Sequence, residues 1–238
     1  MFQRRYMCRE LWIVVYVFWN NIYDFISDKT SYPIYLVMQD KIGGIVSIGD
    51  MSLFVLNVEK LGFLFLYLTL FANYIPTQIK QLSYYLFSRI SDRRSWFLHT
   101  SLHASFFTLT YVALFEGGNL FFSIYLSYMK LSLTDIKYLI ILFIYLYLEI
   151  SFFTKVFGML CMKYDEPIAF FLTSVIIVVF VLLSIRFANE TLLFLNPFSF
   201  CLAPKVGPQQ WMKLLYLAML NVFSYLIIEK EVCLYECA

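Results

Sequence analysis

The sequence has 238 residues, of which 61% are apolar and only 14% are charged. Average soluble domains contain roughly 45–50% apolar and 25% charged residues, so this chain carries more apolar surface than a soluble fold can bury. The formal net charge of +2 does not favour nucleic acid as a partner, because the basic residues form no single long tract. Several charge-poor runs approach the length of a membrane span. The sequence therefore predicts an all-α, polytopic integral membrane protein.

The apolar runs predict about six transmembrane helices in a single membrane domain that covers residues 1–238. Turn formers and charges set their boundaries: Pro76 closes the second span, whose outer end holds Glu59 and Lys60, and Glu116-Gly117-Gly118-Asn119 should stop the third. The run 120–129 is too short to cross, and it is either an interfacial helix or an extension of the third span. Asp165-Glu166-Pro167 is typical of a helix start and precedes the fifth. The expected spans are residues 9–26, 52–75, 96–115, 138–162, 167–185 and 211–228.

Two longer connections, residues 27–51 and 186–210, contain proline, glycine and mixed charges and are expected to be outer loops. The second includes Asn196-Pro197, which favours a turn, and residues 191–195 could form a short helix within it. The cytoplasmic side follows from the basic residues. Seven of the 18 lysines and arginines lie in the short segments 4–9 and 80–94, which places both chain ends and the second segment in the cytoplasm.

Residues 78–95 form the only basic, helix-compatible segment between two long apolar runs. Leu82, Leu86 and Ile90 recur every four residues, as on one face of a helix that lies along a membrane surface, and Ser91-Asp92 resembles a helix start. Two interpretations are open: an ordinary positive cytoplasmic loop, or a surface that docks a soluble partner. Trp96 follows as an expected interfacial anchor.

Few residues suggest chemistry. There is no GxxxxGK[ST] phosphate-binding loop, so ATP-driven work would need a second polypeptide. His99 and His103 stand four apart on one helical face, a spacing that suits a metal, but no HExxH glutamate accompanies them. A pair of interfacial polar residues is therefore favoured, and we expect no metal site and no enzyme activity.

Glu149 is the main anomaly, because a carboxylate near the middle of a span is costly and is usually paired or faces a cavity. It is either a gate or pathway residue, or a packing residue that is protonated or hydrogen-bonded to a neighbouring helix. Lys155, six residues further on, is expected to extend toward the cytoplasmic head groups.

The stretch Ser88-Arg89-Ile90-Ser91-Asp92-Arg93-Arg94-Ser95-Trp96, together with six spans and an Asn-Pro-bearing outer loop before the sixth, resembles small ABC-2-type permease subunits of Gram-positive bacteria. Within that group the chain is similar to permeases associated with bacteriocin and lantibiotic immunity or peptide export. The resemblance implies a plasma-membrane permease subunit that moves an amphipathic peptide or a lipid-like molecule out of the bilayer.

The same resemblance implies partners and site residues. A second permease subunit, identical or similar, would meet this chain in the membrane, and separate ATP-binding subunits would carry ATP and Mg²⁺, with no cofactor on this chain. Glu149 would belong to the substrate route. The residues expected to couple to the ATPase are Tyr84, Tyr85, Arg89, Asp92, Arg93, Arg94 and Trp96.

Two other classes remain open. A non-transporting immunity or sensor protein would bind a peptide at the outer loops 27–51 and 186–210. A membrane-embedded enzyme, such as an intramembrane protease, is less favoured because the spans lack paired glutamates, HExxH and a GxSxG-like nucleophile.

Overall fold

The computed structural model describes six stretches of the chain and, near the beginning, Val15 alone. The stretches are residues 52–74, 76–78, 93–127, 133–186, 195–197 and 208–234. All the secondary-structure elements within them are helices, and no strand occurs in these residues. This confirms the all-α class.

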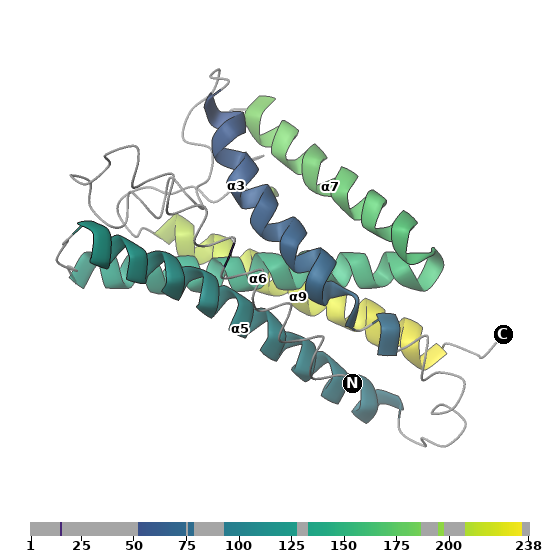
Figure 1. Cartoon of the computed structure of the whole chain (residues 1–238). Helices are drawn as coiled ribbons and strands as arrows, with labels where there is room; N and C mark the ends of the chain where they lie inside the picture. Colours follow the sequence, from purple (N-terminus) through teal and green to yellow (C-terminus); the bar gives the residue numbers. More distant parts are fainter. Residues whose placement is uncertain are drawn as a thin grey trace.

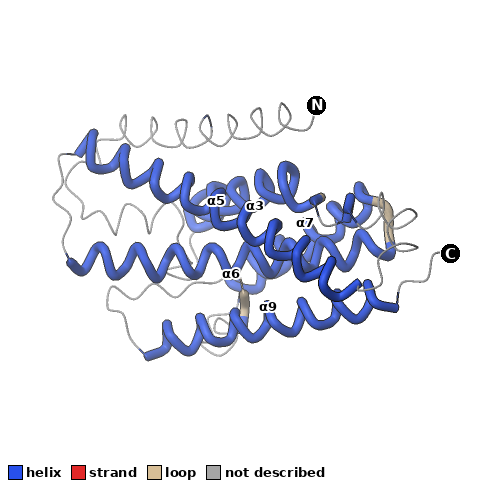
Figure 2. The backbone as a smooth tube through the Cα atoms, turned by 90° about the horizontal axis from the view of Figure 1, so that it is seen from below, coloured by secondary structure: helices blue, strands red, loops and turns tan. Residues whose placement is uncertain are grey.

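Helix α6 is the centre of the arrangement, and it contacts α5, α7 and α9 (Figures 1 and 2). Helix α3 runs beside α7 (Figure 1) and continues directly into the short π-helix η1, which packs against α5 and α6. The elements are α3 (Ser52–Tyr67), η1 (Leu68–Ala72), α5 (Arg93–Ser127), α6 (Leu133–Lys163), α7 (Glu166–Arg186) and α9 (Pro208–Leu234).

Three of the described helices are long and apolar enough to cross a membrane. They are Asp135–Lys163 of α6, Glu166–Leu183 of α7 and Gln210–Val232 of α9, and they coincide with the last three expected spans. Helices α3 and α5 are not among these three: α3 has only 16 residues before η1 begins, and α5 has 35 residues but includes many serines and threonines and two histidines. The first expected span, residues 9–26, lies outside the described residues except for Val15, as do the loop 27–51 and residues 79–92.

The helix break expected at Glu116-Gly117-Gly118-Asn119 does not occur, because α5 continues through these residues to Ser127. Glycine weakens a helix but does not break it as proline does. Here the buried face of α5 extends across the glycines: Val112 and Phe115 before them and Asn119 after them are all buried. Packing on both sides of the glycine pair therefore overrides the local preference, and the run 120–127 is an extension of the helix.

Aromatic side chains join α3 to α5. The Phe63 ring stacks on Tyr111, with ring centroids 4.9 Å apart, and also contacts Phe115. Both buried tyrosine hydroxyls are satisfied: Tyr111 donates to the Phe63 carbonyl oxygen at 2.7 Å, and the Tyr67 hydroxyl lies 2.6 Å from that of Thr108. These aromatic residues thus hold the two helices together, because the rings bury large areas while the hydroxyls find partners.

Helix α7 begins where the sequence predicts. Glu166 opens the helix with Pro167 second, and the backbone N–H of Ala169 donates to the Asp165 carbonyl oxygen at 2.9 Å. Large apolar side chains on this helix remain exposed, among them Phe171 and Leu182. An exposed apolar face of this kind is what a helix against lipid requires.

The continuity of α5 predicts opposite effects for two substitutions at Gly117. A Cβ atom there meets nothing within 4 Å, so Gly117→Ala should raise the free energy of unfolding by about 0.5–1 kcal/mol. Gly117→Pro should lower it by about 3 kcal/mol or more, because it removes a helix hydrogen bond. Thermal unfolding in detergent measures both.

Gly158→Ala, in the last part of α6, is the matched control, since a Cβ atom there also meets nothing within 4 Å. If Gly117→Pro is tolerated as well as Gly117→Ala, α5 is not continuous at this point.

Candidate functional site

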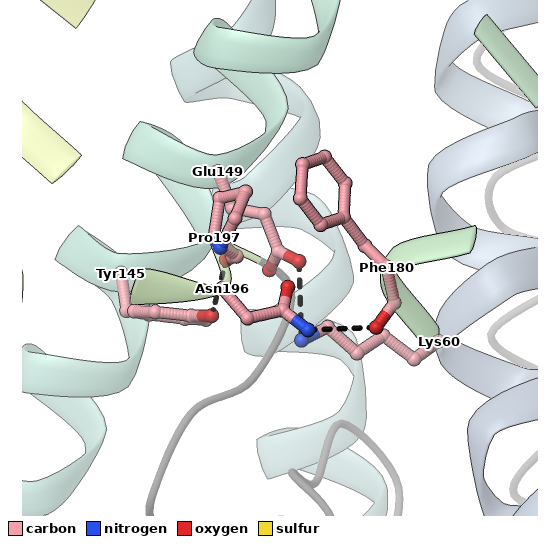
Figure 3. A network of polar contacts seen from close by, with 6 residues as sticks. All are labelled: Lys60, Tyr145, Glu149, Phe180, Asn196 and Pro197. Carbon is pink, nitrogen blue, oxygen red and sulfur yellow. Dashed lines mark hydrogen bonds and ion pairs between the residues drawn. The ribbon is translucent and has the colours of Figure 1, made fainter. Parts of the chain in front are cut away.

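The centre of the helix bundle contains a buried ion pair. Lys60 of α3 places its Nζ atom 3.1 Å from Oε1 of Glu149 on α6, and both side chains have no exposed surface (Figure 3). Removing two charges from water is expensive, and a buried ion pair is tolerated because each group compensates the other. The Lys60–Glu149 pair therefore fixes α3 against α6 at this level.

The pair depends on charge more than on directed hydrogen bonds. Neither carboxylate oxygen of Glu149 has a hydrogen-bond partner of good geometry in the described part of the chain. A second buried ammonium group, that of Lys213 on α9, also acts electrostatically on Glu149. The Lys60 ammonium lies 5.2 Å from the centroid of the Tyr145 ring, within the range of a cation–π contact. Lys60 is thus the cation that pairs directly with this carboxylate, and its ammonium group also faces an aromatic ring.

The turn at residues 195–197 is tied into the bundle beside this pair. Asn196 donates from Nδ2 to the Phe180 carbonyl oxygen of α7 at 2.6 Å, and the Tyr145 hydroxyl donates to the Pro197 carbonyl oxygen at 2.7 Å (Figure 3). The Tyr216 hydroxyl of α9 donates to the Leu195 carbonyl oxygen at 2.8 Å. The turn therefore bonds to α6, α7 and α9.

Residues 195–197 belong to the predicted outer loop 186–210, whose side of the membrane stays a prediction. Asn196 and Pro197 form the expected turn, and both are buried among the helices. Non-helical backbone at the level of apolar helices needs internal hydrogen-bond partners, and the side chains of Tyr145 and Tyr216 supply them. We call Lys60, Tyr145, Glu149, Asn196 and Pro197 the central cluster.

Glu149 was identified from sequence, whereas its partner Lys60 was placed at the outer end of the second span. The sequence does contain a signal for the partner of Glu149. A carboxylate in one span calls for a cation in another, and the expected spans other than that of Glu149 contain few lysines, among them Lys60 and Lys213. Neither hydropathy nor spacing says which cation meets the carboxylate, because that depends on how the helices pack.

The prediction that Lys155 extends toward the head groups is wrong. Its ammonium group donates to Ser151 Oγ at 2.9 Å and to Asn221 Oδ1 of α9 at 2.6 Å. Asn221 in turn donates from Nδ2 to the Leu148 carbonyl oxygen at 2.8 Å. These bonds join α6 to α9. Asn221 on the neighbouring helix therefore accepts the hydrogen bond that Lys155 would otherwise donate to water.

The expected coupling residues are described only in part. Tyr84, Tyr85, Arg89 and Asp92 lie outside the described residues, whereas Arg93, Arg94 and Trp96 form the start of α5. The exposed Arg94 pairs with Glu229 near the end of α9, with Nε 2.5 Å from Oε1.

Trp96 packs against a small apolar cluster formed by α5 and α9, which contains Phe97, Ile228 and Val232. Arg94 and Trp96 thus already have partners within their own chain.

His99 and His103 lie on the exposed face of α5, with ring centroids 4.5 Å apart. In the described ranges, no group of three His, Cys, Asp or Glu side chains could hold a metal ion. The two histidines contact each other at their ring edges and come with no third ligand there.

Comparisons with protein-family models, with curated proteins and with solved structures found no match for this chain.

The charges of the central cluster predict how strongly different substitutions lower the free energy of unfolding. Lys60→Met leaves Glu149 with Lys213, whereas Glu149→Leu leaves Lys60 without its carboxylate and also removes the charge that acts on Lys213. Both single substitutions should lower the free energy of unfolding, and Glu149→Leu should lower it more, by about 3–5 kcal/mol. The double variant should lose less stability than Glu149→Leu alone. Unfolding in detergent, followed by circular dichroism, measures the order.

Lys163→Met, which changes an exposed lysine at the end of α6, is the matched control and should have little effect. Single variants that unfold like the parent, or a double variant that is the least stable of the three, would contradict the role of the pair.

Proposed function

We propose that this chain is the membrane-spanning permease subunit of a transporter whose energy comes from a separate ATP-binding subunit. The observation that carries the proposal is the buried Lys60–Glu149 pair. Ionisable residues inside membrane helices are rare and mark solute pathways or moving parts more often than they mark packing. In this proposal the central cluster is a closed gate between α3 and α6.

The connectivity of the chain supports this mechanical role. Helix α3 carries Lys60 and leads through η1 toward residues 79–92, which belong to the proposed docking segment 78–95; α5 begins directly after them at Arg93. A π-helical turn interrupts the regular α-helical hydrogen bonds, and such turns are frequent at functional sites. A force applied at the docking segment would therefore reach both α3 and α5. Movement of α3 against α6 would separate Lys60 from Glu149.

The remaining features of the proposal come from the resemblance described above. The cargo is an amphipathic peptide of the bacteriocin kind or a lipid-like molecule, and the chain works with a second permease subunit in the bacterial plasma membrane. Both termini lie in the cytoplasm. ATP and Mg²⁺ bind to the partner subunit, and this chain acts as a transport subunit without catalytic residues of its own.

Co-purification with an ATPase tests the proposal. The tagged chain, isolated from its own cells in mild detergent, should bring down an ATP-binding subunit, and Arg93→Glu should weaken this association because it reverses a charge of the docking segment. Arg94 is unsuitable for a single reversal, since Arg94→Glu would also place two carboxylates together at Glu229. The recovered ATPase is measured by mass spectrometry and by ATP hydrolysis.

Lys230→Glu is the matched control, because Lys230 is an exposed cation near the end of α9 and lies outside the docking segment. If the parent chain is recovered without any ATPase from cells that express it at its natural level, the permease proposal fails. Equal recovery with the parent and with Arg93→Glu would remove Arg93 from the docking surface.

A further inference from the structure

A cavity lined by both apolar and polar side chains lies between α5, α6 and α9, separate from the central cluster. Its volume is about 130 Å³, several times the roughly 10–15 Å³ that one water molecule needs. Beside apolar side chains such as Phe97 and Ile228, its lining contains the ammonium group of Lys155 and the hydroxyl-bearing side chains of Ser101, Ser105, Thr108, Ser151, Thr154 and Tyr225. The hydroxyls of Thr108 and Thr154 donate to carbonyl oxygens of their own helices, so Lys155, Ser101 and Ser105 are the donors left for a ligand rich in hydrogen-bond acceptors.

Lys155 gives the cavity an uncompensated positive charge. Its ammonium group is bonded to the neutral oxygens of Ser151 and Asn221, and no carboxylate of the described chain pairs with it. An ammonium group has three hydrogens to donate, so one remains after these two bonds. A partly buried cation without a counter-ion is costly, and an anion in the cavity would offset that cost.

The mouth of the cavity is apolar. Leu98 and Leu102 of α5 line it, and they are 50% and 61% exposed on the outside of the bundle. Between them along the helix lies Ser101, whose Oγ atom is buried and has no hydrogen-bond partner within the described structure. An incoming molecule would therefore meet apolar side chains first and hydroxyl groups with an ammonium group further in.

We propose that this cavity binds the anionic oxygen group, a phosphate or a carboxylate, of an amphiphile whose apolar chain lies over Leu98 and Leu102. Lys155 supplies the charge, and the hydroxyl groups of Ser101 and Ser105 donate to the remaining oxygens. The lining residues of α6 and α9 belong to helices long and apolar enough to span a membrane, so lipid is at hand as a source of such groups. The site does not depend on the transport proposal, because it needs neither an ATPase nor movement of α3.

Lipid binding by the purified chain tests the site. In detergent, native mass spectrometry with phosphatidylglycerol and with phosphatidylcholine should show tighter, saturable binding of the anionic lipid. Lys155→Gln should weaken that binding about tenfold or more, since it removes the charged donor. Ser105→Leu should weaken it as well by filling the cavity, while the bonds of Lys155 to Ser151 and Asn221 stay in place.

Lys163→Gln is the matched control and should bind like the parent, because this lysine is exposed at the end of α6. The melting temperature of each variant shows that it is folded. Displacement of the lipid by millimolar inorganic phosphate, with the same loss in Lys155→Gln, would support the anion site and assign it to a free anion. Unchanged lipid binding in both Lys155→Gln and Ser105→Leu, or an equal loss in Lys163→Gln, would overturn the proposal.

Discussion

The buried attraction between Lys60 and Glu149 is the constraint on which the arrangement of these helices depends. The two groups lie 3.1 Å apart without exposed surface, so neither can return to water unless α3 separates from α6. The neighbouring contacts adapt to this pair: Tyr145 places its ring near the Lys60 ammonium group and uses its hydroxyl to hold Pro197. Compact helix packing alone would not require an ion pair, yet this one lies in the middle of an apolar bundle.

Helix α6 separates two polar regions with different chemistry. Glu149 and Lys155 are six residues apart, which places them about 120° apart around a helix of 3.6 residues per turn. Glu149 faces Lys60 on α3, whereas Lys155 faces Asn221 on α9 and the cavity beside α5. In the first region, Lys60 and Glu149 compensate each other's charge. In the second, no carboxylate of the described chain pairs with Lys155. One helix therefore supports both a proposed gate and a proposed anion site.

Much of the helix pattern followed from sequence, because long apolar runs and a proline beside acidic residues are local signals. They predicted the ends of α7 closely and marked Glu149 as a buried carboxylate. The sequence-based predictions are wrong where contacts between residues far apart in the sequence determine the structure. Gly117-Gly118 stays helical because Val112, Phe115 and Asn119 pack on both sides of it, and Lys155 turns inward because Asn221 of α9 is there to accept. The burial of Asn196 and Pro197 and the partner of Glu149 likewise depend on how the helices pack, which no local pattern contains.

In the proposed transport mechanism, the region around Glu149 is closed at rest and opens to water during transport. Leu146 lies three residues before Glu149 on the same side of α6 and is fully buried, so Leu146→Cys reports on this region without altering its charges. In a variant whose five native cysteines are replaced, labelling of this cysteine by a water-soluble thiol reagent should be slow in resting membrane vesicles. It should become faster when the ATPase partner hydrolyses ATP. Rapid labelling at rest, or a rate that ATP hydrolysis does not change, would contradict the account.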